Sequence, residues 1–276
     1  MKNTTALLLV ILSLSIISCK KRKEAKANEE IYWPKGTTEY CDRTSSLFLP
    51  DCRGEIVREG KVFIKDDRKF LFGGDNHDWD FDITEWCLNE CQLHYGLGRE
   101  RFKALIEPEY ETVSAAENSY SDGARFIVLQ GNHTVKAYPI TLLTTHEVIN
   151  DTIDGNPVMI VYCILADLAA VYDRVHCNRT LTFAVSGYTY FDKEIWDGLD
   201  GFILWDRDTE SLWWPLIDKA VSGPMKGSAM VKYDKTKWHE ATWSTIKSEY
   251  PNAEVLKDNQ TMDPPATWTV YSSSGC

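Results

Sequence analysis

The sequence predicts an α+β fold: a mainly antiparallel β-sheet core, a few short helices and a cysteine-containing N-terminal cap. Three observations support this prediction. Short runs rich in β-branched and aromatic residues recur between turn signals, which is typical of strands. Few helical periods separate these runs, so parallel crossover units are not expected. The segment before residue 111 is irregular and carries most of the cysteines.

The expected elements begin in the predicted cap, residues 31–110. Strands are expected over Lys61–Ile64 and Lys69–Phe72. A short helix is expected to begin at Asp82–Glu85, with Thr84 as its N-cap, and to contain Cys87 and Cys91.

The predicted main domain, residues 111–276, opens with a hairpin of strands Phe126–Gln130 and Val135–Tyr138. Pro139 suits the first turn of a helix formed by ITLLTTHEVIN. Val158–Cys163 is continuously apolar, which indicates a buried central strand. Further strands are expected over 170–173, 180–186, 201–205 and 211–214, followed by a helix over Lys237–Tyr250 that Pro251 stops.

Residues 1–30 are predicted to be a targeting and anchoring segment. The apolar run Ala6–Ile17 is too short to span a membrane but suits a signal peptide. It ends in Ile-Ile-Ser-Cys, a pattern that leads to lipidation of Cys19. We therefore expect a signal peptide over 1–18 and a lipidated cysteine with a charged tether over 19–30; an ordinary secretory signal is the alternative. The expected location is the cell envelope, anchored to a membrane by lipid and facing outside the cytoplasm, in the periplasm or at the cell surface.

The charge balance excludes one class of partner. Residues 31–276 carry 24 basic and 38 acidic side chains, because residues 1–30 hold six of the 30 basic and three of the 41 acidic residues. Such a negative body repels nucleic acid, and no basic patch with interleaved aromatic residues offsets it. No nucleic-acid partner is expected.

The cysteine count is odd once Cys19 is assigned to lipid. Seven cysteines remain, and an exported protein uses thiols mainly for disulfides. The locally plausible pairs are Cys41 with Cys52 and Cys87 with Cys91, although spacing does not determine connectivity. A zinc site built from those four is the alternative, but neither pair has the usual spacing. At least one cysteine is left free, ligated or reactive.

Several stretches resemble a known family. KAYPITLLTTHEVINDTIDGNPVMIVYCILADLAAVYDR, LTFAVSG, FILWDRDTESLWWPL and AVSGPMKG are similar to domain-of-unknown-function family 3179, a group of uncharacterised bacterial envelope proteins, over roughly residues 80–256. The resemblance implies no settled activity. The family has His-Glu before Asn-Asp, which His146-Glu147 and Asn150-Asp151 match. Its Tyr-Cys-Pro-Leu-Cys-Gly motif begins at Tyr162-Cys163 but is then broken by Ile164, Ala166 and Asp167, so a two-thiol motif is incomplete.

The candidate site lies around His146 and Cys163. A thiolate and an imidazole can bind copper or zinc, or can act as a nucleophile and its base. Either role needs a third group, which Asp151, Asp173 or His176 could supply. The structural alternative is a buried free cysteine and a histidine that bonds a carbonyl. The residues expected to line a ligand pocket are Glu147, Asp151, Asp173, Ser186, Asp208 and Thr209, the last two in a polar turn that can instead hold itself together.

The sequence thus predicts an envelope lipoprotein with a ligand or metal pocket around His146 and Cys163. A cysteine-dependent hydrolase or transferase is one alternative. A carbohydrate-binding or scaffold module is another, because ten tryptophans could supply an aromatic platform. The small-molecule, metal or envelope partner, the reaction and any enzymatic activity are left open.

Overall fold

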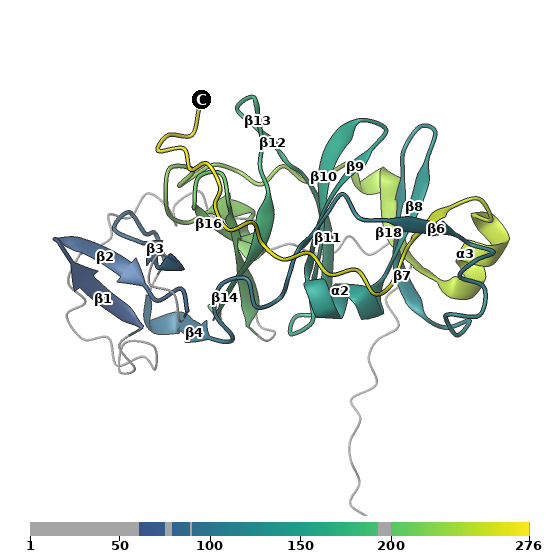
Figure 1. The fold of residues 1–276 in the computed structure, drawn as a ribbon, viewed down its shortest axis with the longest axis horizontal. Coiled ribbons are helices and arrows are strands. Elements are labelled where there is room, and N and C mark those ends of the chain that lie inside the picture. The colour runs from purple at the N-terminus through teal and green to yellow at the C-terminus, as the bar shows by residue number, and fades with distance from the viewer. Residues whose placement is uncertain (1–60, 75–78, 89, 193–199, 276) are drawn as a thin grey trace, which may run out of the picture. The chain divides into compact units, whose positions relative to one another are not determined.

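The computed structural model describes residues 61–74, 79–88, 90–192 and 200–275, all within the compact unit Trp33–Cys276. The described residues confirm the predicted class: an α+β fold dominated by antiparallel strands, with the short helices α2 (Ile140–His146) and α3 (Trp243–Glu249) (Figure 1). None of the described helices has the length and apolar character needed to cross a membrane.

Three larger sheets form the body of the described chain. The central sheet has the order β11-β10-β9-β5: Leu168–Asp173, Asn156–Cys163, Val148–Ile153 and Leu105–Ile106. The aromatic sheet has the order β17-β16-β15-β14-β4: Lys219–Ala220, Leu212–Trp214, Gly201–Asp206, Phe183–Tyr190 and Leu93–Tyr95. The outer sheet has the order β18-β7-β8-β19-β6: Trp238–Thr242, Arg125–Gln130, Val135–Pro139, Glu254–Leu256 and Tyr110–Thr112.

Two small sheets and three single 3-10 turns complete the described elements. The first small sheet comprises β1, β2 and β3: Val62–Lys65, Arg68–Leu71 and Phe81–Asp82. The second comprises β12 and β13: Val175–His176 and Arg179–Thr180. The 3-10 turns are Glu90–Gln92, Pro215–Ile217 and Lys235–Lys237.

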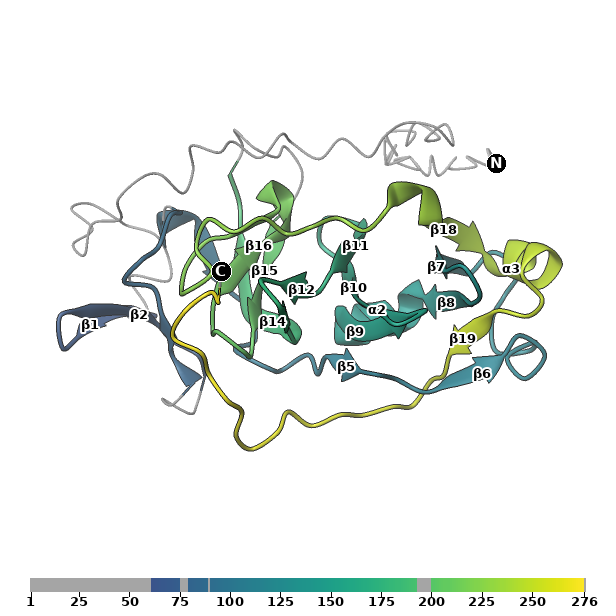
Figure 2. The same cartoon turned by 90° about the horizontal axis from the view of Figure 1, so that it is seen from above.

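The central sheet lies between the aromatic and outer sheets (Figures 1 and 2). Its strand β10 is buried on both faces, as the continuous apolar run predicts. Met159, Val161 and Cys163 join the core shared with the aromatic sheet. Val158, Ile160 and Tyr162 join the core shared with the outer sheet. The thiol of Cys163 therefore lies on the side of the aromatic sheet.

The outer sheet uses its other face to hold α3. Thr242 caps the helix by accepting a hydrogen bond from the Thr245 N–H. Trp243 is fully buried, and its ring stacks on Phe126 of β7 with 5.2 Å between centroids. The C-terminal segment then leaves β19 and runs past β5 back towards the small sheet of β1–β3 (Figure 2).

The prediction of a helix beginning at Asp82–Glu85 is wrong. Asp82 ends strand β3, Thr84 and Glu85 form a turn, and the next described element is the 3-10 turn at Glu90. The backbone N–H groups are used elsewhere: Ile83 donates to the Lys69 carbonyl, and Cys87 donates to Val221. Contacts with distant strands thus replace the bonds that an α-helix would make to carbonyls four residues earlier.

Two other predicted helices are shorter than expected. The expected helix over Lys237–Tyr250 begins only at Trp243, because Trp238–Thr242 pairs with β7 as strand β18. The helix that follows Pro139 ends at His146, and β9 begins at Val148. Trp238 of β18 is buried in the core beneath the outer sheet, and Val148 and Ile149 of β9 are buried on opposite faces of the central sheet, so strand packing prevails in both segments.

Candidate functional site

A pocket of about 280 Å³ lies beside the end of β10. Its walls come from three places: the end of α2 with the end of β10, the strands β14 and β15, and the loop after β4. Most of the lining side chains are apolar or aromatic, which is usual for small-molecule sites. Two lining residues, Glu147 and Cys163, belong to the predicted site.

Glu147 occupies an unusual position in the backbone. It directly follows the last residue of α2, and its N–H donates to the Leu143 carbonyl. Its φ of 60° and ψ of −31° lie in a region that non-glycine residues seldom occupy. Its carbonyl accepts from the Tyr162 N–H at 3.1 Å, so it extends the pairing of β9 with β10. Strained residues of this kind cluster at functional sites.

The Glu147 side chain is largely buried and has no partner among the described residues. The residue is 8% exposed, and no described residue donates a hydrogen bond to its side chain or forms an ion pair with it. Burial alone raises the pKa of this carboxyl to about 7. Buried carboxyls are normally hydrogen-bonded or paired. An unpartnered one in a pocket wall is a group available to a ligand.

Cys163 supplies the second polar group of the pocket. It is a free thiol and 1% exposed. Burial raises its pKa to about 11, and the negative charge of Glu147 adds to the shift. The thiolate is the nucleophilic form of cysteine, so this environment disfavours nucleophilic chemistry at neutral pH. Here Cys163 acts as a neutral wall of the pocket.

Gly187 shapes the wall opposite. The pairing of β14 with β15 shifts register between Val185 and Tyr188, and Gly187 has φ +82° at this bulge. A Cβ at Gly187 would lie 2.3 Å from the carbonyl carbon of Gly98. The Gly187 carbonyl also accepts from the Gly96 N–H at 2.8 Å. The absent side chain therefore lets the loop after β4 close against β14.

His146 lies next to Glu147 but is directed elsewhere. Its Nδ1 is 2.7 Å from the Lys103 carbonyl, and it is not among the residues that line the pocket. Within the described part of the chain, no group of three or more His, Cys, Asp or Glu residues is arranged to hold a metal ion. The structure therefore brings Glu147, rather than His146, together with Cys163.

Asp151 faces the other side of the central sheet. It accepts hydrogen bonds from Tyr138 at 2.6 Å and from Tyr110, and its two oxygens lie 2.9 and 3.0 Å from the Lys136 ammonium. These partners come from the outer sheet. Asp151 thus helps to join the central and outer sheets and does not line the pocket.

The remaining predicted pocket residues also hold local structure. Asp173 accepts from the Val175 N–H, and Ser186 donates to the Ile203 carbonyl at 2.6 Å. Asp208 accepts from the Thr182 N–H at 2.7 Å. Thr209 donates to Asp206, which is the centre of the turn, and also lines a separate pocket of about 430 Å³.

Asp206 is the buried acceptor at the centre of this turn. It is fully buried, and its carboxylate accepts from the Thr209 N–H at 2.6 Å and from Trp213 Nε1 at 2.7 Å. Burial raises its pKa to about 6. The polar turn is therefore organised around a buried carboxylate, in agreement with the structural interpretation of this motif.

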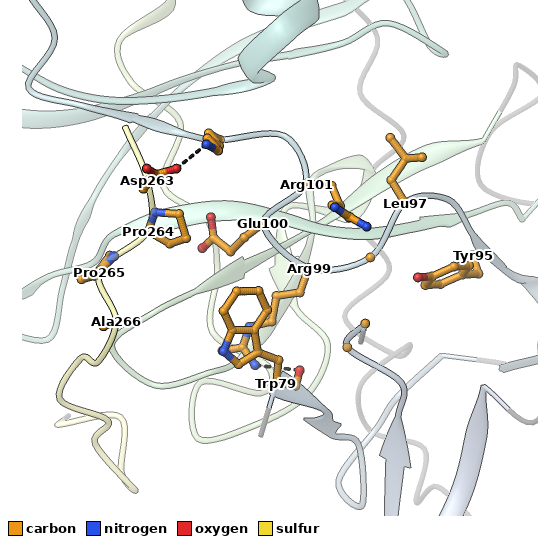
Figure 3. Close-up of a pocket in the computed structure, with 14 residues that line it drawn as sticks. Trp79, Tyr95, Leu97, Arg99, Glu100, Arg101, Asp263, Pro264, Pro265 and Ala266 are labelled. Carbon is orange, nitrogen blue, oxygen red and sulfur yellow. Dashed lines mark hydrogen bonds and ion pairs between the residues drawn. The ribbon is translucent and has the colours of Figure 1, made fainter. Parts of the chain in front are cut away.

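A larger pocket of about 510 Å³ lies between the loop after β4 and residues 263–266 (Figure 3). Four of its charged residues form ion pairs, with each other or with oppositely charged residues outside the pocket. Arg99 bonds Glu210 at 2.7 Å, Glu100 forms a two-point ion pair with Arg207, and Lys103 pairs with Asp263. These pairings leave the larger pocket without a buried group that lacks its charge partner.

Cys19, Cys41 and Cys52 lie outside the described residues. The lipidation of Cys19 and the pairing of Cys41, Cys52, Cys87 and Cys91 remain predictions.

Comparison with known proteins connects the chain to one family. The model of the family described as protein of unknown function (DUF3179) matches residues 99–265, which include the pocket residues Glu147, Cys163 and Gly187. The comparisons with curated proteins and with solved structures gave no match. Because the matched segment covers more than half of the chain, this protein belongs to the DUF3179 family.

Proposed function

We propose that this protein is a lipid-anchored envelope protein whose globular part binds a small, largely apolar molecule in the Glu147–Cys163 pocket. One observation carries the binding proposal: Glu147 is only 8% exposed, its carboxyl has no partner among the described residues, and it lines a pocket of about 280 Å³. A ligand that hydrogen-bonds to this carboxyl would supply the missing partner.

The pocket favours binding over thiol chemistry. With a pKa near 11, fewer than about one Cys163 thiol in a thousand is ionised at pH 7.5. No described histidine lines the pocket to act as its base. The carbohydrate-platform alternative has little support, because six tryptophans are buried in the cores: Trp86, Trp205, Trp213, Trp214, Trp238 and Trp243.

Cys163 provides a way to test binding at this site. Purified protein is treated with a small uncharged thiol reagent at pH 9, with and without each member of a panel of small apolar compounds. Modification of Cys163 is followed by peptide mass spectrometry. A ligand of the pocket should slow that modification at least fivefold and should raise the melting temperature. If no compound does either, the binding proposal fails.

The location rests on the sequence pattern at Cys19 and needs its own test. Cells grown with an alkyne-labelled fatty acid should yield labelled protein in the membrane fraction. Cys19→Ser should lose the label. Equal labelling of wild type and variant would contradict the anchor.

A further inference from the structure

The ligand class can be narrowed from the electrostatics of the pocket. No described residue donates a hydrogen bond to the Glu147 carboxyl or shifts its pKa by a nearby charge. Besides Glu147, the titratable residues that line the pocket are Cys163 and Tyr188. The Tyr188 hydroxyl donates to the Phe72 carbonyl at 2.6 Å, and Cys163 is a neutral thiol. When Glu147 ionises, its negative charge therefore has no counter-charge within the pocket wall.

Aromatic rings surround the same space. Phe102, Tyr188 and Phe202 line the pocket together with Glu147. Tyr188 and Phe202 are buried, at 1% and 5% exposure. The faces of aromatic rings attract cations, and sites that recognise organic ammonium groups combine such rings with apolar walls. A carboxylate next to aromatic rings is complementary to an organic cation.

The pocket mouth and the protein's charge agree with this choice. Leu97, Ile164 and Leu165 line the pocket and are 55%, 52% and 46% exposed. They offer apolar contact to the body of a ligand. Residues 31–276 hold 38 acidic against 24 basic side chains, so the surrounding field attracts cations and repels anions.

We propose that the Glu147–Cys163 pocket binds a small organic cation, an ammonium group with at least one N–H on a compact apolar body. The ammonium donates to the Glu147 carboxylate, and the apolar body contacts the aromatic rings and the leucine and isoleucine side chains of the mouth. The N–H is part of the proposal because the carboxylate lacks a hydrogen-bond donor. This inference rests on the proposed binding function and specifies its ligand.

Three probes with the same ring separate charge from shape: cyclohexylamine, cyclohexanol and cyclohexanecarboxylate. Each is titrated into the wild-type protein by calorimetry at pH 8, where Glu147 is mostly ionised and the amine is protonated. We expect the amine to bind at least tenfold more tightly than the alcohol and the carboxylate not to bind. Glu147→Gln should lower the affinity for the amine at least tenfold and change the affinity for the alcohol less than twofold. Glu249→Gln replaces an exposed glutamate of α3 and should change the affinity for neither compound.

Proton exchange gives a second readout. Near pH 7 Glu147 is about half protonated, so amine binding should release protons. The apparent binding enthalpy should then depend on the ionisation enthalpy of the buffer, and this dependence should vanish in Glu147→Gln.

The outcomes distinguish the two proposals. Equal binding of amine and alcohol, or unchanged amine binding in Glu147→Gln, overturns the cation proposal and leaves the binding function standing. Absence of binding by all three probes also overturns it. The binding function itself fails only if no compound of the wider panel shields Cys163.

Discussion

The side-chain amide of Asn150 makes the two hydrogen bonds to Phe183 that the backbone of a neighbouring strand residue would otherwise make. Its Nδ2 donates to the Phe183 carbonyl at 2.8 Å, and its Oδ1 accepts from the Phe183 N–H at 2.8 Å. Asn150 is on β9 and Phe183 begins β14, so one buried side chain links the central sheet to the aromatic sheet. The pocket lies between these sheets and depends on how they are held together.

Replacing this amide should destabilise the fold. Asn150→Ala leaves the N–H and C=O of Phe183 buried without partners, which should lower the free energy of unfolding by about 2–4 kcal/mol. Urea unfolding followed by tryptophan fluorescence measures this loss. Asn156→Ala is the control, because in the described structure its exposed amide donates to the Ile153 carbonyl at 3.2 Å. This variant should lower the free energy of unfolding by less than about 1 kcal/mol. Equal losses in both variants would contradict the assigned role.

Glu147 should make stability depend on pH. The fold raises its pKa from 4.5 to about 7, so the folded state holds this proton more tightly than the unfolded chain does. The contribution of Glu147 to the free energy of unfolding is largest at or below pH 4.5, declines as the pH rises to about 7 and is then constant. The two limits differ by on the order of 3 kcal/mol.

Glu147→Gln should remove this dependence. The variant should therefore be more stable than wild type at pH 8 and nearly equal to it at pH 4.5, as judged by urea unfolding at the two values. Glu249→Gln serves as the exposed control and should follow the wild type. A Glu147→Gln variant that loses stability equally at both pH values would show that the carboxyl has a partner in solution.

Cys163 should react slowly in the native protein. Because its pKa is raised to about 11, alkylation by iodoacetamide at pH 7.5 should be at least a hundredfold slower than in the urea-unfolded chain. The rate should rise with pH up to about 11, and peptide mass spectrometry can assign it to this cysteine. Rapid alkylation near neutral pH, slowed by His146→Ala, would instead support the nucleophile hypothesis.

The Asp206 turn should be important for stability. Asp206→Ala leaves the Thr209 N–H and the Trp213 indole N–H without their acceptor in a buried setting. We expect a loss of about 3 kcal/mol or more by thermal or urea unfolding. Asp208→Ala removes the acceptor of the Thr182 N–H at a half-buried position. It should lower the free energy of unfolding less than Asp206→Ala does. The reverse order would refute this account of the turn.

Gly187 should not tolerate a side chain. An alanine there meets the Gly98 backbone at 2.3 Å and also adopts φ +82°. Gly227→Ala is a matched control, since Gly227 has φ +83° with nothing within 4 Å of the added Cβ. In the control, backbone strain alone should lower the free energy of unfolding by about 1 kcal/mol. Gly187→Ala should lower the free energy of unfolding clearly more than the control does, and ligands should protect Cys163 less well in this variant. Equal losses of stability in the two variants would show that the loop after β4 is free to move.

The pattern of buried strands could be predicted from the sequence. Val158–Cys163 forms most of β10 and is buried on both faces, as a continuous apolar run implies. The hairpin of Phe126–Gln130 with Val135–Tyr138 is also present as β7 and β8. Helix boundaries could not be predicted as well, because Trp238–Thr242 becomes a strand only through its pairing with β7. Propensity is local, whereas that pairing joins residues more than a hundred positions apart.

The candidate site was predicted in part. The sequence drew attention to His146, Glu147 and Cys163, and two of the three line one pocket. It could not show that His146 turns towards Lys103, nor that Asn150 and Asp151, adjacent in the chain, serve opposite faces of β9. The opposite directions of Asn150 and Asp151 could have been predicted once the segment was recognised as a strand, since adjacent side chains of a strand alternate in direction.

The sequence by itself determined the fold class, the family resemblance, the acidic charge and the expectation of a lipid anchor at Cys19, because each depends on composition or on a local pattern. Only the tertiary structure decided that the Glu147 carboxyl lacks a partner among the described residues. Burial and hydrogen bonding depend on every segment that packs around a side chain. Asp206 finds donors from Thr209 and Trp213, whereas Glu147 meets a mainly apolar wall built by β10, β14 and the loop after β4.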